Sequence, residues 1–306
     1  MPNRVYCIPS SRRSDALVEH RETSDRFQLL NGSWKFRYYA SIYDLQDAFY
    51  EVGYDASAFD SIPVPSVWQN HGYDHHQYTN IRYPFPADPP YVPKENPCGA
   101  YLYDFTYQKD ATAPCAFLNF EGVASCFYVW LNGKFVGFSE VSHCTSEFDV
   151  ADFAVRGENT LCVLVVKWCP GTYLEDQDCF RFSGIFREVY LLARGKERLD
   201  DIFVRSYVSD DFNSAELRVE AKLSTPCDIK YKLVAPDGVT VSEGVGGEKF
   251  SISVDSPVLW NDEQPELYEL WLTVGDEIVL LDTAVRRFEI KDGVCLLNGK
   301  AGKARG

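Results

Sequence analysis

Two polar residues far apart in the chain, Asp178 and Asn80, have the side-chain chemistry to hold a hydroxyl-rich ligand or a hard cation. An aspartate is a bidentate acceptor and an oxygen ligand for metals, and an asparagine amide both donates to and accepts from one hydroxyl. Asp178 ends an acidic run, residues 175–178 (EDQD), whereas Asn80 lies in a long polar loop. By residue type alone, a structural role is favoured over ligand binding for both residues. Asp178 would shape a turn or pair with Arg181, and asparagine such as Asn80 is common at turns. Assigning either residue therefore needs a wider context.

Other residues with catalytic or binding potential have simpler explanations. Three loop histidines lack a further cluster of ligands, which indicates surface residues rather than a metal site. A Ser-Gly pair lacks the G-x-S-x-G context of a nucleophile elbow. Tryptophans at strand positions are more typical of a core than of a carbohydrate-stacking platform. These residues are His71, His75, His76, Ser183, Trp34, Trp68 and Trp130.

The chain has ten cysteines, none of them in a C-x-x-C pair, and several lie inside apolar strand-like runs. Such residues are usually small buried hydrophobes in a reducing compartment, and a zinc site would need closer spacing. Residues 1–20 are polar, without the apolar core of a secretory signal. We therefore expect a cytoplasmic protein that folds without disulfides. The cysteines are Cys7, Cys98, Cys115, Cys126, Cys144, Cys162, Cys169, Cys179, Cys227 and Cys295.

The elements that position these residues are mostly strands in residues 100–192. Asn132-Gly133 separates two apolar runs and predicts a tight hairpin, because both turn positions need positive φ. Residues 160–168 are almost continuously apolar, which indicates a strand covered on both faces. The one helical signal is at residues 41–51, where a capping box and apolar spacing coincide. Eight prolines in residues 61–97 predict a long loop.

After residue 192 the composition shifts, and the charged residues 193–201 are expected to form a linker. Beyond them, Leu217, Val219, Ala221 and Leu223 alternate with polar residues, which is typical of a strand with one wet face. A turn is predicted at residues 236–238 (PDG), and about seven short strands fit an immunoglobulin-like sandwich, although no Cys-Trp-Cys signature is present. The predicted fold is all-β: a jelly-roll β-sandwich followed by an immunoglobulin-like β-sandwich.

Composition limits the function classes. A chain of 306 residues suggests two domains, and 15% aromatic residues with a single Met favour β-structure. The formal charge of -15 excludes nucleic acid and anionic membranes as natural partners, because both would repel this surface. No segment approaches the roughly 18 apolar residues that a membrane helix needs.

Four stretches resemble family 2 glycoside hydrolases, in particular the β-galactosidase branch. They follow the family's order, and together with a further match at residues 297–300 (LNGK) they are spread over residues 29–300, nearly the whole chain; the third stretch is the most specific. One departure is Ala284 before Val285-Arg286, where the family often has Gly. The stretches are residues 29–36 (LLNGSWKF); 64–69 (VPSVWQ) with 71–73 (HGY) and 78–84 (YTNIRYP); 173–178 (YLEDQD) with 181–187 (RFSGIFR); and 259–260 (LW) with 265–268 (PELY).

The resemblance implies a domain order. An N-terminal arm (1–26) precedes a jelly-roll sugar-binding domain (27–196) and an immunoglobulin-like sandwich (197–289). Residues 290–306 would then lead into a (β/α)₈ barrel, and the chain is expected to stop before it. In the family, that barrel carries two catalytic glutamates, the first preceded by Asn, together with the magnesium ligands. No Asn-Glu pair occurs in this sequence, so we expect no catalytic residues here and no turnover by the chain alone.

The resemblance also assigns roles to the two polar residues. Asp178 matches the aspartate that contacts the bound sugar and ligates sodium, here as part of an incomplete metal site. Asn80 matches the loop asparagine that hydrogen-bonds a sugar hydroxyl. No cofactor is expected in this chain, whereas sodium and magnesium are implied for the full-length enzyme. The expected partners are a β-galactoside, bound weakly in isolation, and the barrel of the same polypeptide; a homo-oligomer of the full enzyme stays open.

Three alternatives differ in testable features. A stand-alone carbohydrate-binding module would need a complete sugar site within the first sandwich. Another family 2 activity, β-glucuronidase or β-mannosidase, fits the fold, but residues 176–178 (DQD) and 78–84 (YTNIRYP) favour a galactosidase. An adhesion or scaffold protein of sandwich domains is disfavoured because no signal peptide is apparent.

Overall fold

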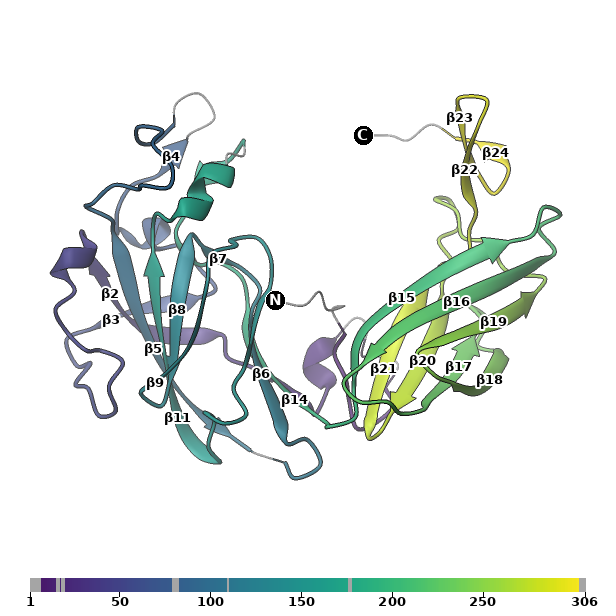
Figure 1. The fold of residues 1–306 in the computed structure, drawn as a ribbon, viewed down its shortest axis with the longest axis horizontal. Helices are drawn as coiled ribbons and strands as arrows, with labels where there is room; N and C mark the ends of the chain where they lie inside the picture. The colour runs from purple at the N-terminus through teal and green to yellow at the C-terminus, as the bar shows by residue number, and fades with distance from the viewer. Residues whose placement is uncertain are drawn as a thin grey trace. The chain divides into compact units, whose positions relative to one another are not determined.

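The protein is built from β-strands and short 3-10 turns throughout the residues that the computed structural model describes, which are 7–14, 17, 20–78, 83–108, 110–175 and 178–302. The chain divides into two compact units, residues 28–193 and residues 1–27 together with 194–306 (Figure 1). Each unit is a β-sandwich with its own hydrophobic core. The all-β prediction is confirmed.

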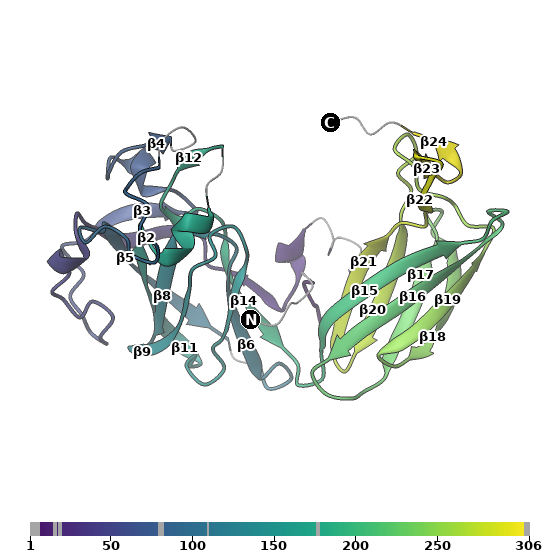
Figure 2. The same ribbon diagram turned by 45° about the horizontal axis from the view of Figure 1, so that its top comes forward.

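The first unit packs a six-stranded sheet, β3-β2-β5-β11-β8-β9, against a four-stranded sheet, β1-β14-β6-β10. Side chains from both sheets, such as Trp34 and Phe120, meet in one core. Two short ladders, β12-β4 and β13-β7, complete the unit, and Figure 2 shows β4 and β12 together at one end of it. The strands are β1 Phe27–Leu29, β2 Gly32–Tyr39, β3 Asp60–Val64, β4 Gln77–Tyr78, β5 Cys98–Tyr107, β6 Cys115–Phe120, β7 Val123–Ala124, β8 Cys126–Leu131, β9 Lys134–Ser139, β10 Ser146–Asp149, β11 Gly157–Val166, β12 Phe180–Arg181, β13 Gly184–Ile185 and β14 Val189–Arg194.

Strand β11 is the buried centre of this unit. It pairs antiparallel with β5 on one side and β8 on the other. Its odd residues Leu161 and Val163 face the core between the sheets, and its even residues Cys162 and Leu164 face a second, outer cluster. Burying each Leu or Val side chain contributes about 1.5–3 kcal/mol. The strand with two covered faces, predicted from the apolar run, is confirmed.

The β8–β9 hairpin turns at Asn132 and Gly133, whose φ angles are 53° and 78°. Both residues therefore adopt the left-handed conformation that the tight turn requires. Asn132 also binds residues 153–159, which lead into and begin β11. Its Nδ2 donates to the Phe153 carbonyl at 3.0 Å and to Asn159 Oδ1 at 2.8 Å. The predicted hairpin is confirmed.

The helix expected at residues 41–51 is wrong in extent: only a 3-10 turn, η3 (Ile42–Asp44), forms. The capping box is real, since the Ser41 amide donates to Asp44 Oδ2 at 3.1 Å. The apolar spacing has another cause, because Ile42, Leu45 and the buried Phe49 all pack onto the outer cluster of the six-stranded sheet from an irregular segment. A helix this short has little intrinsic stability, so tertiary packing decides the conformation.

The loop expected at residues 61–97 is partly structured. Strand β3 occupies its start, and its Pro63 is tolerated because β3 is an edge strand of its sheet. A 3-10 turn, η4 (Trp68–His71), follows, and the short strand β4 comes after it. Residues 83–97 form no strand or helix, as predicted.

The second unit is a sandwich of a three-stranded sheet, β15-β16-β19, and a four-stranded sheet, β18-β17-β20-β21, around one core. Three plus four antiparallel strands fit the predicted immunoglobulin-like architecture. Leu217, Val219 and Leu223 on β16 are buried as their alternation predicted. The strands are β15 Leu199–Val208, β16 Ser214–Leu223, β17 Ile229–Val234, β18 Thr240–Gly246, β19 Lys249–Asp255, β20 Tyr268–Val274 and β21 Glu277–Thr283.

The linker expected at residues 193–201 is much shorter in the structure. Strand β14 continues through Arg194 and β15 begins at Leu199. The charged residues that suggested a linker are paired instead: buried Arg194 donates twice to the buried Glu277 carboxylate, at 2.7 and 3.0 Å, and Arg198 Nε donates to Asp200 at 3.0 Å. Pairing satisfies charges that would otherwise demand solvent.

The described residues of the N-terminal arm belong to the second unit. They include η2 (Arg21–Thr23), and Ser10 forms an isolated antiparallel bridge with Ile278 on β21. Leu17 is buried with Trp271 and Leu280, and the Arg13 guanidinium lies 4.2 Å from the Trp271 ring centre. At the other end of the chain, β22 (Phe288–Lys291), β23 (Val294–Leu297) and β24 (Lys300–Ala301) form a small sheet joined by Asp-Gly and Asn-Gly turns.

Candidate functional site

The candidate site is built on the segment that leaves the buried strand β11. The chain passes through Trp168, whose backbone is clamped by Asn96: Nδ2 donates to the Trp168 carbonyl at 2.7 Å and Oδ1 accepts from its amide at 2.9 Å. A 3-10 turn, η5 (Pro170–Leu174), follows, with Pro170 at a position where its missing N–H costs nothing. This rigid start fixes where the acidic run 175–178 begins.

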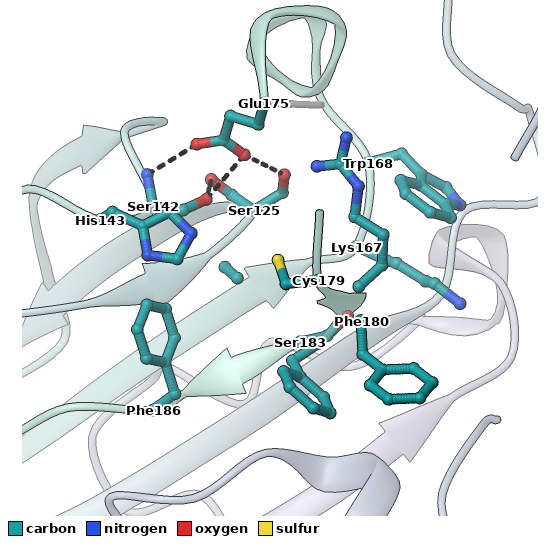
Figure 3. A pocket seen from close by; sticks show the side chains of 13 residues that line it. Ser125, Ser142, His143, Lys167, Trp168, Glu175, Cys179, Phe180, Ser183 and Phe186 are labelled. Carbon is teal, nitrogen blue, oxygen red and sulfur yellow. Dashed lines mark hydrogen bonds between the residues drawn. The ribbon is translucent and has the colours of Figure 1, made fainter. Parts of the chain in front are cut away.

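Glu175, the first acid of that run, has a structural role. Its carboxylate accepts hydrogen bonds from the Ser142 amide at 3.0 Å, the Ser142 hydroxyl at 2.9 Å and the Ser125 hydroxyl at 3.4 Å. Figure 3 shows these bonds converging on Glu175 from two other segments. With its oxygens engaged in this way, Glu175 anchors the loop.

Asp178 is exposed, and its carboxylate accepts a hydrogen bond from the Tyr78 hydroxyl. The backbones meet at the same place, because β4 pairs antiparallel with β12 and aligns Tyr78 with Phe180. Two segments one hundred residues apart in sequence thus form one surface. Tyr78 was not predicted as the partner of Asp178; the only sequence signal for it is its place within the YTNIRYP stretch.

Asn80 lies outside the described residues, between Tyr78 and Tyr83. Tyr83, like Tyr78, contacts the segment that leads to Asp178: its hydroxyl donates to the Thr172 carbonyl at 3.0 Å, and its ring stacks on Tyr173 with centroids 5.6 Å apart. The described residues on both sides of Asn80 are therefore attached to the η5–Asp178 segment. The expected proximity of Asn80 to Asp178 stays a prediction.

A buried ion pair holds the start of the Asn80 loop. The Lys167 ammonium, 4% exposed, pairs with the Asp74 carboxylate, 6% exposed. Asp74 also lies 3.1 Å from His75 Nδ1 and accepts a long hydrogen bond from Gln69 Nε2 at 3.5 Å. Because Lys167 follows β11 directly, the pair ties this loop to the central strand.

A cavity of about 110 Å³ lies beside the acidic run (Figure 3). Ser125, Ser142 and Glu175 line one part, and Phe180, Phe182 and Phe186 line another. Pockets that enclose a small-molecule ligand are typically about 300–1,000 Å³. This cavity is too small to enclose a sugar.

The donor set fits only part of a metal site. An exposed carboxylate such as that of Asp178 is a suitable hard-oxygen ligand for sodium. Among the described residues, however, no group of three or more His, Cys, Asp or Glu side chains could hold a metal ion. The role of Asp178 as a sodium ligand therefore stays a prediction.

The tryptophans, Ser183 and His76, for which the sequence suggested structural or surface roles, lie as follows. Trp34 and Trp68 are fully buried, and Ser183 is buried against Gln69, whose Oε1 accepts from the Ser183 amide at 3.0 Å. Trp130 is half-buried and stacks on Tyr50. His76 lies edge-on to two phenylalanine rings of the site, Phe180 and Phe182, at 6.0 and 5.8 Å.

Comparison with known proteins identifies the family. Residues 27–195 match the family model described as glycosyl hydrolases family 2, sugar binding domain, and residues 197–290 match the model described as glycosyl hydrolases family 2. The chain belongs to glycoside hydrolase family 2.

Two relatives of this chain are β-galactosidases. The chain is 47% identical over 305 residues to a β-galactosidase of Actinobacillus pleuropneumoniae, which covers 99% of this chain and 30% of that protein. It is 40% identical over 308 residues to a β-galactosidase of Staphylococcus xylosus, with 100% and 30% covered. The chain is homologous to the N-terminal part of these enzymes and spans about 30% of their length.

Solved structures share the fold. A β-glucuronidase of Ruminococcus gnavus superposes with a TM-score of 0.73 at 20% identity, over 92% of this chain and 48% of that one. A β-glucuronidase from an uncultured Clostridium gives a TM-score of 0.72 at 24% identity, over 90% and 47%. Along the described residues, no helix has the length and hydropathy needed to cross a membrane.

Proposed function

We propose that this chain is the non-catalytic N-terminal part of a cytoplasmic β-galactosidase. Its first sandwich serves as a jelly-roll sugar-binding domain, and it contributes Asp178 and Asn80 to a sugar site that a (β/α)₈ barrel of the same polypeptide completes. One observation carries the proposal. The Tyr78–Asp178 hydrogen bond joins the two sequence stretches that resemble the family's sugar-contacting loops, in a chain 47% identical to a β-galactosidase.

The chemistry divides between the two parts of such an enzyme. A retaining glycosidase needs a nucleophile and an acid/base carboxyl about 5–5.5 Å apart. These would be the barrel's glutamates, since no Asn-Glu pair occurs in this sequence. The chain's own residues bind and orient: Asp178 accepts from a sugar hydroxyl, Tyr78 holds the Asp178 carboxylate, and Asn80 donates to or accepts from a second hydroxyl.

Sodium and magnesium belong to the proposed complete enzyme. Asp178 would supply one sodium ligand, and a bound cation would supply charge that orients a sugar hydroxyl beside it. The magnesium ligands would come from the barrel. The proposal leaves open whether the complete enzyme is a homo-oligomer.

The alternatives have less support. A stand-alone carbohydrate-binding module needs a complete site, and the cavity beside Glu175 measures only about 110 Å³. A β-glucuronidase is suggested by the superposed structures, but their identities of 20–24% reflect the shared fold. The relatives at 40–47% identity are β-galactosidases.

A chimera tests the proposal. This chain would replace the corresponding N-terminal 30% of the Actinobacillus pleuropneumoniae relative, and turnover of a chromogenic β-galactoside would be measured in a host without its own enzyme. We expect an active chimera, in which Asp178→Ala lowers kcat/KM by about 100-fold, or about 2.7 kcal/mol of transition-state binding.

Asp152→Ala is the matched control, because Asp152 is an exposed aspartate on a turn of the same unit. It should leave kcat/KM unchanged. A folded chimera without turnover, or equal activity in the Asp178 and Asp152 variants, would contradict the proposal.

A further inference from the structure

A single side chain, Tyr173 on η5, contacts the proline-rich segment after β4 at several points. Its hydroxyl donates to the Tyr91 carbonyl at 2.6 Å and accepts from the Asp88 amide at 3.2 Å. The Pro86 carbonyl lies 3.4 Å from the same oxygen. A tyrosine hydroxyl has one proton to donate, and the nearer Tyr91 carbonyl is the better acceptor. The hydroxyl therefore serves as donor and as acceptor within residues 86–91.

The ring of Tyr173 packs on the same segment. It stacks on Tyr83 with the two ring planes 7° apart, and it meets Phe85 edge-on at 5.5 Å. Phe85 in turn meets Trp168 edge-on at 5.2 Å, and the Trp168 backbone is the one that Asn96 clamps. Stacked and edge-to-face pairs are the favoured arrangements of aromatic rings. The aromatic contacts therefore connect the segment to the rigid start of η5.

The segment after β4 depends on contacts of this kind. Residues 83–97 form no strand or helix, and their prolines have no N–H to donate. Backbone groups outside a sheet or helix are paired by side chains or by water. Tyr173 supplies two kinds of attachment to this segment: ring contacts at residues 83 and 85, and hydrogen bonds at residues 88 and 91.

Tyr173 belongs to one of the two sequence stretches that form the candidate site and binds the other. It precedes the acidic run that ends at Asp178, and its partner Tyr83 follows β4, which contains Tyr78. The two stretches are thus joined at two places. The first is the β4–β12 pair with the Tyr78–Asp178 hydrogen bond, and the second is the set of Tyr173 contacts.

We propose that Tyr173 is a positioning residue for sugar binding. It fixes the segment after β4 against η5, so that Tyr78 keeps the Asp178 carboxylate where a sugar hydroxyl meets it. The inference rests on the proposed function, because that proposal assigns Asp178 to the sugar. Tyr173 acts through Asp178 and needs no contact with the sugar itself. Misplacing a substrate-positioning group by about 1 Å lowers a rate by as much as about 100-fold, so a loosened segment should have a measurable effect.

Hydrogen exchange in the intact chain tests the contacts, independently of activity. Tyr173→Phe keeps the ring and removes the hydroxyl, so the Asp88 amide loses its acceptor. In peptides that contain Asp88, we expect this amide to exchange about tenfold faster than in the unsubstituted chain. Tyr173→Ala, which removes the ring contacts as well, should accelerate exchange further across residues 83–92. Unchanged exchange of this segment in Tyr173→Phe would overturn the proposal.

A double-mutant cycle in the chimera tests the functional role. Tyr173→Ala should lower kcat/KM for a chromogenic β-galactoside by about tenfold, chiefly by raising KM. In the Asp178→Ala background the same substitution should have no further effect, because it acts through Asp178. Tyr173→Phe, which keeps the ring contacts, should stay within about threefold of the unsubstituted chimera. Tyr103→Ala is the matched control: Tyr103 is half-buried and stacks on Trp34 in the sandwich core, and its loss should leave kcat/KM unchanged.

The outcomes separate this inference from the proposed function. An inactive unsubstituted chimera would contradict the proposed function and the positioning role together. An active chimera in which the effects of Tyr173→Ala and Asp178→Ala multiply would contradict the positioning role alone, because Tyr173 would then act independently of Asp178. Equal losses in Tyr173→Ala and Tyr103→Ala would likewise show a general effect on folding rather than positioning.

Discussion

At the scale of single residues, the buried Lys167–Asp74 ion pair stabilises a segment next to the candidate site. Both side chains are almost fully buried, so each charge depends on the other for compensation. Lys167 directly follows the end of β11, and Asp74 lies in the segment that leads into β4, the strand that contains Tyr78. The pair therefore couples the position of that segment to β11, the buried central strand of the unit.

Removing one partner should be costly. We expect Asp74→Ala to lower the free energy of unfolding of the first unit by about 3–5 kcal/mol, because the Lys167 ammonium is left buried without its counter-charge. Asp47→Ala, which breaks an exposed 3.4 Å pair with Arg37 in the same unit, should cost less than about 1 kcal/mol. Urea denaturation measures both, and similar losses in the two variants would show that the buried pair has no special role.

At the scale of elements, the outer cluster explains why residues 41–51 mimic a helix in sequence. Phe49 is 1% exposed and meets Trp130 edge-on at 5.8 Å. Ile42 and Leu45 pack on the same cluster. Apolar residues at helical spacing thus pack an irregular segment against a sheet, and Phe49 is the most deeply buried of them.

Truncating that side chain tests the packing. Phe49→Ala should lower the free energy of unfolding by about 3–5 kcal/mol, because it opens a cavity against the sheet. Tyr43→Ala, in the same segment but 66% exposed, should change it by no more than about 0.5 kcal/mol. Limited proteolysis within residues 45–56 should accelerate in the Phe49 variant, and unchanged cleavage would mean that other contacts hold the segment.

The β8–β9 turn gives a second test at this scale. Gly133→Ala should destabilise the first unit by about 1–2 kcal/mol, because an L-residue is strained in the left-handed region. Its φ is 78°, and the added Cβ would lie 3.0 Å from Val52 Cγ2. Gly247→Ala, with open space and no positive φ, should leave the melting temperature unchanged. A melting temperature as high in Gly133→Ala as in the unsubstituted chain would contradict the turn assignment.

Local sequence patterns correctly predicted those elements whose conformation is determined by neighbouring residues. The Asn132-Gly133 turn, the two-faced strand β11 and the alternation on β16 each follow from neighbouring residues. Strand β3 was missed because its Pro63 suits an edge strand, and edge position is a property of the whole sheet. The short connection before β15 was missed because the charge of Arg194 is compensated by Glu277, which lies 83 residues away.

The candidate site shows the same limit. The acidic run 175–178 was visible in sequence, but its division into an anchor, Glu175, and an exposed acceptor, Asp178, depends on Ser125, Ser142 and Tyr78 from three other segments. The resemblance to a family suggested which acid mattered. The hydrogen bonds that separate the two roles could be identified only in three dimensions.

At the scale of the whole molecule, all ten cysteines are present as thiols in the structure. We predict that protein purified without added oxidant, then unfolded without reductant, titrates as ten thiols with Ellman's reagent. The reason is that the cysteines serve mainly as small packing residues. Two or more intramolecular bridges in untreated protein would contradict this.

The chain by itself is expected to show no glycosidase turnover, because no Asn-Glu pair supplies the catalytic carboxyls. A chromogenic β-galactoside assay on protein from a host without its own enzyme checks this. Turnover that co-purifies with the chain through two chromatographic steps would show that catalytic groups are present after all.

The central claim is that this chain holds a partial sugar site, with Asp178 at its edge. Isothermal titration of the isolated chain with galactose tests it most directly. We predict a dissociation constant no tighter than about 1 mM, which corresponds to about 4 kcal/mol, because Asp178 is exposed and the cavity lined by its neighbour Cys179 measures only about 110 Å³. A micromolar constant that is lost in Asp178→Ala would contradict the account and establish a complete binding site within this chain.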